Sequence, residues 1–187
     1  MERRYNLKSN HVIVSYPRSG SNYFQLAWKE KNDEYIRCVR TYEMIKPIIE
    51  NSSLIVIGLI RNPVDSITSR VLIHKTHEKF FKNEQSEIDF ALSEYIKIYK
   101  FIIDRADFIV DLSSFNQIDK VIETISSSEQ TLVNKDNIYS GLNDIQNYSP
   151  SFIGHEDYER VRNVIKKQDL ETHNSLYNLA YKKRLVV

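Results

Sequence analysis

Cysteine, glycine and proline are scarce in this chain of 187 residues, which has one cysteine, four glycines and four prolines. The single cysteine, Cys38, excludes a disulfide framework within the chain and a cysteine-based zinc site. The longest apolar run, residues 54–60, is far too short to span a bilayer. No apolar stretch follows the polar residues at the start, so we expect no secretory signal, a cytoplasmic location and no membrane partner.

A large charge of either sign is also missing. Lysine and arginine number 26 against 25 aspartates and glutamates, which gives a formal net charge of +1. General nucleic-acid binders usually need a strong basic excess, so we expect no nucleic-acid partner. A local basic pocket for a small anion remains compatible with this balance. Hydrophobic residues make up 41% of the chain, which is enough to predict a packed, single-domain protein.

Apolar and polar patterns predict strands that alternate with helices. The predicted strands are residues 11–16, 34–39, 53–60 and 108–110, and the predicted helices are residues 19–31, 42–50, 63–74, 88–106, 117–126, 156–167 and 170–183. This alternation favours βαβ units and a mostly parallel sheet of four to five strands. The charged segment 76–87 shows no strong period and is predicted to be a surface loop or lid.

The first strand leads through a short loop into a helix, and residues 16–23 have the sequence Tyr-Pro-Arg-Ser-Gly-Ser-Asn-Tyr. The first N–H groups of a helix lack intrahelical partners and the helix dipole is positive there, so such a junction can bind an anion. Gly20 allows close approach of the backbone, and Arg18 adds a forked cation. Serine and asparagine are also ordinary helix caps, so a plain capped helix is the alternative.

A second junction follows the apolar strand at 53–60. Asn62 is a natural N-cap, Pro63 suits the first helical position, and Asp65 favours the positive end of the helix dipole. Arg61 has no such structural explanation. It ends the strand at the carboxyl edge of the sheet, where ligands of open α/β sheets bind. A salt bridge is the alternative role for this arginine.

Taken together, the two junctions resemble the sulfotransferase family, whose cofactor is 3′-phosphoadenosine 5′-phosphosulfate (PAPS). The first motif of that family is close to Tyr-Pro-Lys-Ser-Gly-Thr-Thr-Trp, which residues 16–23 follow with conservative changes. The second motif begins with Arg-Asn-Pro and places a serine eight residues after the arginine, as Arg61 and Ser69 are placed here. A weaker third match is Asp111-Leu112 after the last strand.

The resemblance implies a three-layer α/β fold of the P-loop type. It implies one sulfotransferase-like domain over residues 1–187, with a motif-bearing core at about 10–127 and a helical part at 128–187. Such an enzyme moves a sulfuryl group from PAPS to a hydroxyl or amine of a small-molecule or glycan acceptor, and it releases adenosine 3′,5′-bisphosphate (PAP). The family transfer needs no metal, and the sequence offers no clustered carboxylate or histidine set.

The resemblance also assigns roles to residues. The implied cofactor-binding residues are Arg18, Ser19, Gly20, Ser21, Asn22, Tyr23, Arg61 and Ser69. Arg61 and Ser69 would hold the 3′-phosphate, and Arg18 takes the place of a lysine that serves the leaving group. Because one PAPS molecule must reach both loops, the strands that precede them should be neighbours in the sheet.

The histidine that serves as general base in many members of the family has no counterpart in this chain. Many small-molecule members carry Lys-Thr-His after the second strand, where this chain has Arg-Thr-Tyr at 40–42. Tyr42 therefore replaces the histidine, and its ordinary pKa of ~10 makes it a poor base at neutral pH. Glu43 could serve if it is partly desolvated, and we rank it first. His77, from the predicted lid, ranks second.

The C-terminal part lacks the Arg-Lys-Gly motif with which cytosolic members cover the 3′-phosphate. Arg160, Arg162, Lys166 and Lys167 are either substitute charges or a solvated helix face. Two further functions stay open. The chain could be a PAP-binding module with little or no turnover, or an NTP-dependent, kinase-like enzyme. The absence of Gly-x-x-x-x-Gly-Lys-Ser/Thr opposes the second of these.

Overall fold

A computed structural model describes residues 11–17, 19–32, 36–49, 54–76, 83–111, 122, 124–125 and 155–184. Its strands are β1 (His11–Ser15), β2 (Arg37–Val39), β3 (Ile55–Ile60) and β4 (Phe108–Asp111). Its longer helices are α1 (Ser21–Asn32), α2 (Tyr42–Ile49), α3 (Pro63–Thr76), α4 (Glu84–Arg105), α7 (His155–Lys166) and α8 (Glu171–Lys182).

The four described strands form one sheet in the order β2-β1-β3-β4, and every pair is parallel. The register of the central pair places Val12 opposite Val56. Parallel strands end at the same edge of a sheet, so the loops after β1 and β3 start side by side. The parallel sheet and the pairing of the two motif strands confirm the sequence-based expectations.

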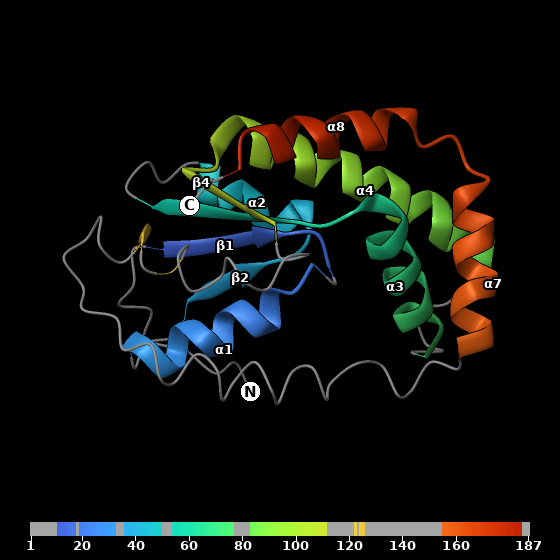
Figure 1. Cartoon of the computed structure of the whole chain (residues 1–187), viewed down its shortest axis with the longest axis horizontal. Helices are drawn as coiled ribbons and strands as arrows, with labels where there is room; N and C mark the ends of the chain where they lie inside the picture. The colour runs from blue at the N-terminus through green and yellow to red at the C-terminus, as the bar shows by residue number, and fades with distance from the viewer. Residues whose placement is uncertain are drawn as a thin grey trace.

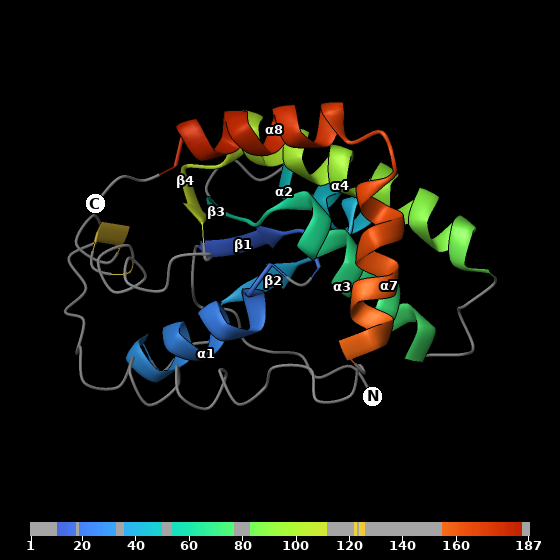
Figure 2. The ribbon, with the colours of Figure 1, turned by 45° about the vertical axis from the view of Figure 1, so that its right-hand side comes forward.

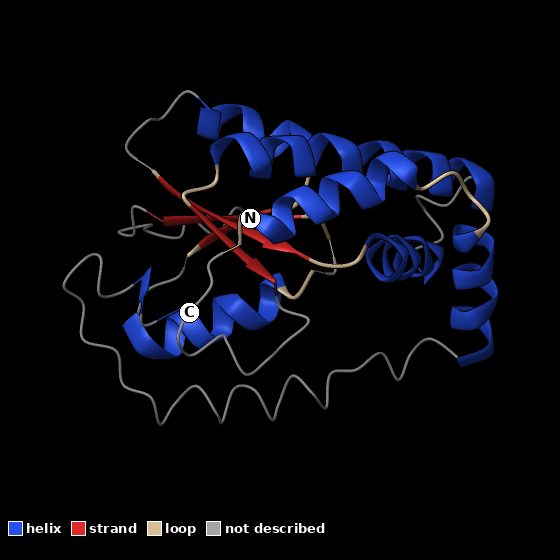
Figure 3. Ribbon diagram, turned by 45° about the horizontal axis from the view of Figure 1, so that its top comes forward, coloured by secondary structure: helices blue, strands red, loops and turns tan. Residues whose placement is uncertain are grey.

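The sheet lies between two helical layers, with α1 on one face and α4 and α8 on the other (Figures 1 and 3). Side chains alternate along β1, because successive residues of a strand point to opposite faces. Val12 and Val14 therefore join the core cluster under α4, while Ile13 joins the cluster under α1. Trp28 of α1 is buried in the second cluster, as a core residue is expected to be. The fold is a three-layer α/β fold.

Helix α4 approaches β3 closely at Gly58. A Cβ atom at this position would lie 2.5 Å from Cγ2 of Ile102 and 3.2 Å from Cβ of Ala106. Ile102 belongs to α4 and Ala106 is its C-terminal cap, so a side chain at position 58 would push helix and strand apart. Glycine is thus required here for packing, and it brings the polar tips of α4 side chains within reach of the end of β3.

Helices α3 and α7 stand side by side beyond the carboxyl ends of the strands (Figures 1 and 2). Only residues 61 and 62 separate the end of β3 from the start of α3. Helix α7 comes from the C-terminal part of the chain and packs against α3. The C-terminal helices are therefore integral parts of the domain, and α7 lies next to the second junction.

The prediction of a loop or lid at 76–87 is wrong at both ends. Thr76 is the last residue of α3, and α4 begins at Glu84. The Asn83 side chain caps α4 by accepting a hydrogen bond from the N–H of Ser86 at 2.8 Å. The first turn of α4 is polar and acidic, which suits the positive end of a helix dipole but gives no apolar period. Residues 77–82, with His77, lie outside the described residues.

Other boundaries differ by a few residues. Helix α1 begins at Ser21 rather than at 19, and β2 begins at Arg37 rather than at 34. Of the predicted helix 117–126, only residues 122, 124 and 125 are described, and they are helical. Arg18 and the segment 126–154 lie outside the described residues. No described helix is both long and apolar enough to cross a membrane.

Candidate functional site

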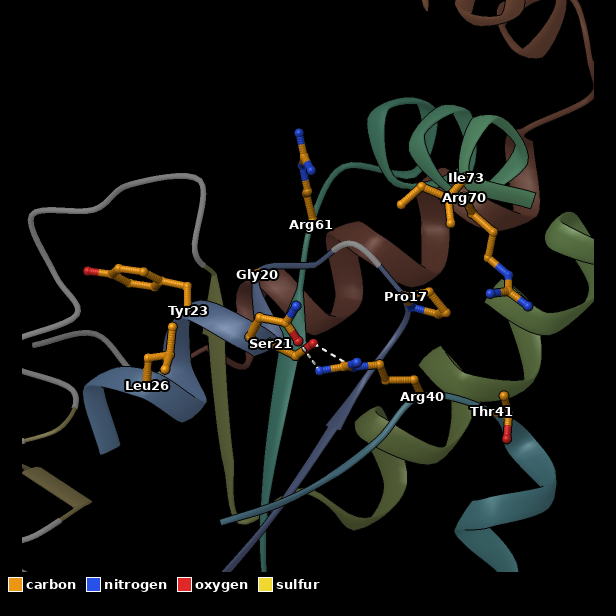
Figure 4. Close-up of a pocket in the computed structure, with 11 residues that line it drawn as sticks. Pro17, Gly20, Ser21, Tyr23, Leu26, Arg40, Thr41, Arg61, Arg70 and Ile73 are labelled. Atoms are coloured by element: carbon orange, nitrogen blue, oxygen red, sulfur yellow. Dashed lines mark hydrogen bonds between the residues drawn. The ribbon is translucent and has the colours of Figure 1, made fainter. Parts of the chain in front are cut away.

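A cavity of about 650 Å³ opens where β1, β2 and β3 end. Its volume is within the range of sites that hold one small molecule. The lining residues come from both junctions, from the loop after β2 and from α3: Pro17, Gly20, Ser21, Asn22, Tyr23, Leu26, Arg40, Thr41, Arg61, Arg70 and Ile73. The cavity therefore joins the two sequence motifs in a single site (Figure 4).

The first junction is a tight turn that opens α1. The N–H of Ser19 donates to the carbonyl of Tyr16 at 3.1 Å, and the N–H of Phe24 donates to the carbonyl of Gly20 at 3.1 Å. Gly20 has a φ of 82°, in the left-handed region that favours glycine. The N–H groups that precede Phe24 in α1 come too early to have intrahelical acceptors. The start of α1 thus offers backbone donors at the cavity.

The side chain of Ser19 is buried, and its hydroxyl has no hydrogen-bond partner among the described residues. A buried hydroxyl without a partner is unfavourable by about 1–3 kcal/mol, and most buried polar groups in proteins are satisfied. Ser19 lies in the loop between β1 and α1, beside the positive end of the helix dipole. An oxyanion bound at this loop would supply the missing partner.

Arg40, at the end of β2, reaches across to the start of α1 (Figure 4). Its Nε donates to Ser21 Oγ at 2.9 Å, and its Nη2 donates to Asn22 Oδ1 and, at 3.1 Å, to Gln25 Oε1. All three acceptors are neutral, so no carboxylate among the described residues compensates the guanidinium charge. Arg40 therefore adds a full positive charge to the end of α1 that already carries the positive pole of the dipole.

The second junction is capped as the sequence predicts. Asn62 Oδ1 accepts from the N–H of Val64 at 3.0 Å, and its carbonyl accepts from the N–H of Ser66 at 3.1 Å. Pro63 occupies the first position of α3. Asp65 lies in the first turn, where its charge favours the dipole. The roles expected for these residues from the sequence are confirmed.

Two buried tyrosines of α4 hold the main chain of Arg61. The N–H of Arg61 donates to Tyr99 Oη at 2.7 Å, and the Arg61 carbonyl accepts from Tyr99 Oη at 2.7 Å and from Tyr95 Oη at 3.1 Å. Burial raises the pKa of both phenols, so they stay protonated donors at any physiological pH. The tyrosines fix the peptide groups at position 61, a residue that also lines the cavity.

Helix α7 braces the second junction from outside. Arg162 Nε lies 3.2 Å from Asp65 Oδ1, which ties α7 to the first turn of α3. Burial raises the pKa of Tyr158, which is partly buried in α7. Ser69 is buried and is not among the lining residues of the cavity. The predicted 3′-phosphate pair is therefore split, because Arg61 lines the cavity and Ser69 does not.

The other cations predicted as substitutes for the missing motif have different positions. Arg160 forms a bidentate pair with Glu84, with both N–O distances at 2.7 Å, and so connects α7 to α4. Lys166 and Lys167 are exposed. The two arginines of α7 thus connect helices to one another. None of the four predicted substitutes, Arg160, Arg162, Lys166 and Lys167, is among the described lining residues of the cavity.

The candidate bases are not part of the described lining. Glu43 is exposed in the first turn of α2, and Tyr42 is partly buried, with its ring 6.0 Å from Lys97 Nζ. The N–H of Tyr42 donates to Glu94 Oε2 at 3.2 Å. Arg18 and His77 lie outside the described residues. The structure brings together the cofactor loops of the prediction but does not join Tyr42 or Glu43 to them.

Sequence reasoning assigned no binding role to Arg40, Arg70 or Tyr158. A signal for Arg40 exists, because it ends a strand at the carboxyl edge of the sheet as Arg61 does. Arg70 and Tyr158 have no comparable signal. Their positions depend on how α3 and α7 face the sheet, which only the tertiary packing decides.

The charged residues among those described as lining the cavity are all positive. It contains three arginines, Arg40, Arg61 and Arg70, and no aspartate, glutamate, histidine or cysteine. Among the described residues, no group of three or more potential ligands could hold a metal ion. With the N-terminus of α1 and three guanidinium groups, the site is suited to a ligand with more than one anionic group.

Comparison with known proteins adds no relative to this picture. No protein-family model matches the chain, and neither a curated protein nor a solved structure is significantly similar to it. The function is therefore inferred from the residues of the site and their geometry.

Proposed function

We propose that the protein is a sulfotransferase that moves a sulfuryl group from PAPS to a hydroxyl or amine of an acceptor. One observation carries the proposal. The pairing of β1 with β3 places a Tyr-Pro-Arg-Ser-Gly loop and an Arg-Asn-Pro junction on one cavity whose described lining has three arginines and no carboxylate. A ligand with two separate anionic ends, as PAPS has, matches the start of α1 and the guanidinium of Arg61, which both line this cavity.

The residues of the two junctions would divide the cofactor between them. The loop at Gly20 and Ser21, with Arg40 beside it, would hold the 5′-phosphosulfate. Ser19 of the same loop is buried and is not among the described lining residues. Arg61 would hold the 3′-phosphate, since a forked donor suits a terminal phosphate group. In the transfer, the acceptor oxygen or nitrogen bonds to sulfur, the bond from sulfur to the phosphate oxygen breaks, and a base takes the acceptor proton.

The first test is a calorimetric titration with PAP. We expect micromolar binding that requires the 3′-phosphate, so adenosine 5′-phosphate should bind much more weakly. Arg61→Ala should weaken PAP binding by about tenfold to a hundredfold, the value of one charge-assisted contact. The matched control is Arg105→Ala, because Arg105 is an exposed arginine at the end of α4 and is not part of the cavity lining.

The result can contradict the proposal in two ways. Wild-type protein that fails to bind PAP would overturn it. A clear preference for ATP with magnesium over PAP would favour an NTP-dependent enzyme in its place. Equal affinities of the Arg61→Ala and Arg105→Ala variants would show that Arg61 has no part in the site.

A PAP-binding module without turnover is the second candidate. The observation that favours it is the absence of a carboxylate or imidazole from the described lining. PAP release from PAPS across a panel of phenol, alcohol and amine acceptors separates the two candidates. We expect the wild type to release PAP. The rate of release should fall in the one variant, among Glu43→Gln, Tyr42→Phe and His77→Gln, that lacks the general base. Tight PAP binding with no PAP release in any mixture would establish the module.

A further inference from the structure

Arg70 is a cavity residue to which the proposed cofactor gives no role. It lies in α3, and its side chain lines the cavity together with Ile73, one turn further along the same helix. Its guanidinium carbon lies 5.6 Å from the centre of the Phe90 ring, which is 48% exposed. At this distance the ring and the guanidinium form a cation–π contact.

No carboxylate among the described residues pairs with Arg70. Its Nε is buried and has no hydrogen-bond partner among them. The ring in contact with its guanidinium, Phe90, belongs to α4, and the hydroxyl of Tyr16 also reaches α4, where it donates to the Ala91 carbonyl at 3.0 Å. Glu94 lies on the same helix, but its carboxylate is engaged by Lys97 Nζ and the N–H of Tyr42, each at 3.2 Å.

Arg70 is separate from both expected phosphate positions. Arg70 comes seven residues after Pro63, a rise of about 10 Å along α3. In Figure 4, Arg61 extends away from Ser21, whereas the Arg70 guanidinium lies on the Pro17 side. Arg40 is directed to α1. One arginine therefore remains on the wall of the cavity after each anionic end of PAPS has its own.

We propose that Arg70 binds an acidic group of the acceptor, so that the acceptor carries a carboxylate, a phosphate or a sulfate. This inference rests on the proposed sulfotransferase function. An uncompensated guanidinium with a partly buried N–H edge binds an oxyanion through paired, charge-assisted hydrogen bonds. A neutral acceptor would leave that edge without a partner in the closed complex, which is unfavourable. The site would thus select anionic acceptors over neutral ones of the same shape.

Inorganic phosphate is the probe for this site. Protein saturated with PAP is titrated with phosphate at constant ionic strength, and the line width of the phosphate signal is followed by ³¹P NMR. We expect saturable binding in the wild type and in Arg105→Ala. Arg70→Ala should weaken it about tenfold or more, and Arg70→Lys should lie between, since lysine keeps the charge but loses the fork.

The two proposals can fail separately. If PAP binds but phosphate does not, or if phosphate binds equally well to Arg70→Ala, the Arg70 inference is overturned and the cofactor site stands. If PAP does not bind to the wild type, the sulfotransferase proposal fails, and with it the acceptor assignment. Phosphate titrated alone against Arg70→Ala then shows whether an oxyanion site exists. Circular dichroism and denaturant unfolding that match the wild type confirm that Arg70→Ala is folded.

Discussion

The two strand-to-helix junctions use the same local device but are supported differently. At the first, the side chains of α1 are held by Arg40, which comes from the adjacent strand β2 and pairs with neutral oxygens. At the second, the main chain of Arg61 is held by buried hydroxyls of α4, and the helix start is braced by α7. The first junction is thus built from nearby sequence and the second from distant sequence.

The difference shows where each junction can vary. The first depends on a cation that also faces the cavity, so support and binding charge are combined in Arg40. The second separates the two, because Tyr99 and Tyr95 support the backbone while the Arg61 side chain lines the cavity. Changes in the support of the second junction should therefore reduce stability first and binding second.

The largest effect is expected from Tyr99→Phe. The hydroxyl of Tyr99 bonds both the N–H and the carbonyl of Arg61, so its removal leaves a buried N–H without a partner, at a cost of about 1–3 kcal/mol. Denaturant unfolding measures the loss, and amide exchange should accelerate at Arg61 but not at Phe24. Tyr181→Phe, on the exposed side of α8, is the control. Equal stability of the two variants would refute the support role.

Gly20→Ala is the matching change at the first junction. The left-handed φ of Gly20 is unfavourable for alanine by about 1–2 kcal/mol, so unfolding should require less denaturant. Gly20→Asn should cost less, because asparagine tolerates this region better. PAP affinity should fall in both variants in the same order as stability. An alanine variant as stable as the wild type would contradict the conformation of this loop.

A smaller effect is expected from Asp65→Asn. The pair of Asp65 with Arg162 is partly exposed, and such pairs contribute below about 1 kcal/mol. The free energy of unfolding lost by the double variant, Asp65→Asn with Arg162→Gln, should not exceed the sum of the losses in the two single variants. A double-mutant cycle with a coupling near zero would show that α7 is held by packing and by Tyr158 instead.

The smallest effect near neutral pH involves His173, which supports the second junction only. Its ring is buried against Tyr95, its Nε2 lies 3.1 Å from the Leu92 carbonyl, and its Nδ1 has no partner among the described residues. Burial lowers the pKa of His173 below its ordinary value of 6.5. The folded state therefore prefers the neutral ring. The stability this contributes is complete above pH 6.5 and is lost as the pH falls below it.

His173→Gln tests that pH dependence, because glutamine does not titrate. Unfolding free energies measured at pH 7.5, 6.5 and 5.5 should fall more steeply in the wild type than in the variant. The partners at the first junction are serine, asparagine and glutamine, which do not titrate in this range either. Parallel curves for the two proteins would show that the ring is not buried in neutral form.

Much of the fold follows from local sequence. The apolar runs of β1 and β3 predict buried parallel strands, and Asn62 with Pro63 predicts the start of α3. The first turn of α4 was missed because its acidic residues have no apolar period, although Asn83 is a good N-cap. Acidic residues favour a helix start as much as they favour a loop, so composition alone could not decide between the two.

The candidate site was predicted only where its residues follow a strand. Gly20, Ser21 and Arg61 are local features of strand ends, and they meet on the cavity. The contact of Tyr99 with Arg61 spans 38 residues, and no local pattern indicates it. The same holds for Arg70, whose direction depends on the packing of α3 against α4 and α7. Side-chain direction on a surface helix is set by its neighbours and not by its own sequence.

The positions of the cavity residues along the chain have a consequence for how the protein folds during synthesis. Every described lining residue of the cavity precedes position 74, so a nascent chain that has emerged as far as Thr76 already contains them all. That chain still lacks α4, with the hydroxyls that hold Arg61, and α7, which braces α3. Helices α4 and α7 must therefore be synthesised before the site acquires its final shape, and ligand capture should follow the emergence of α7 from the ribosome.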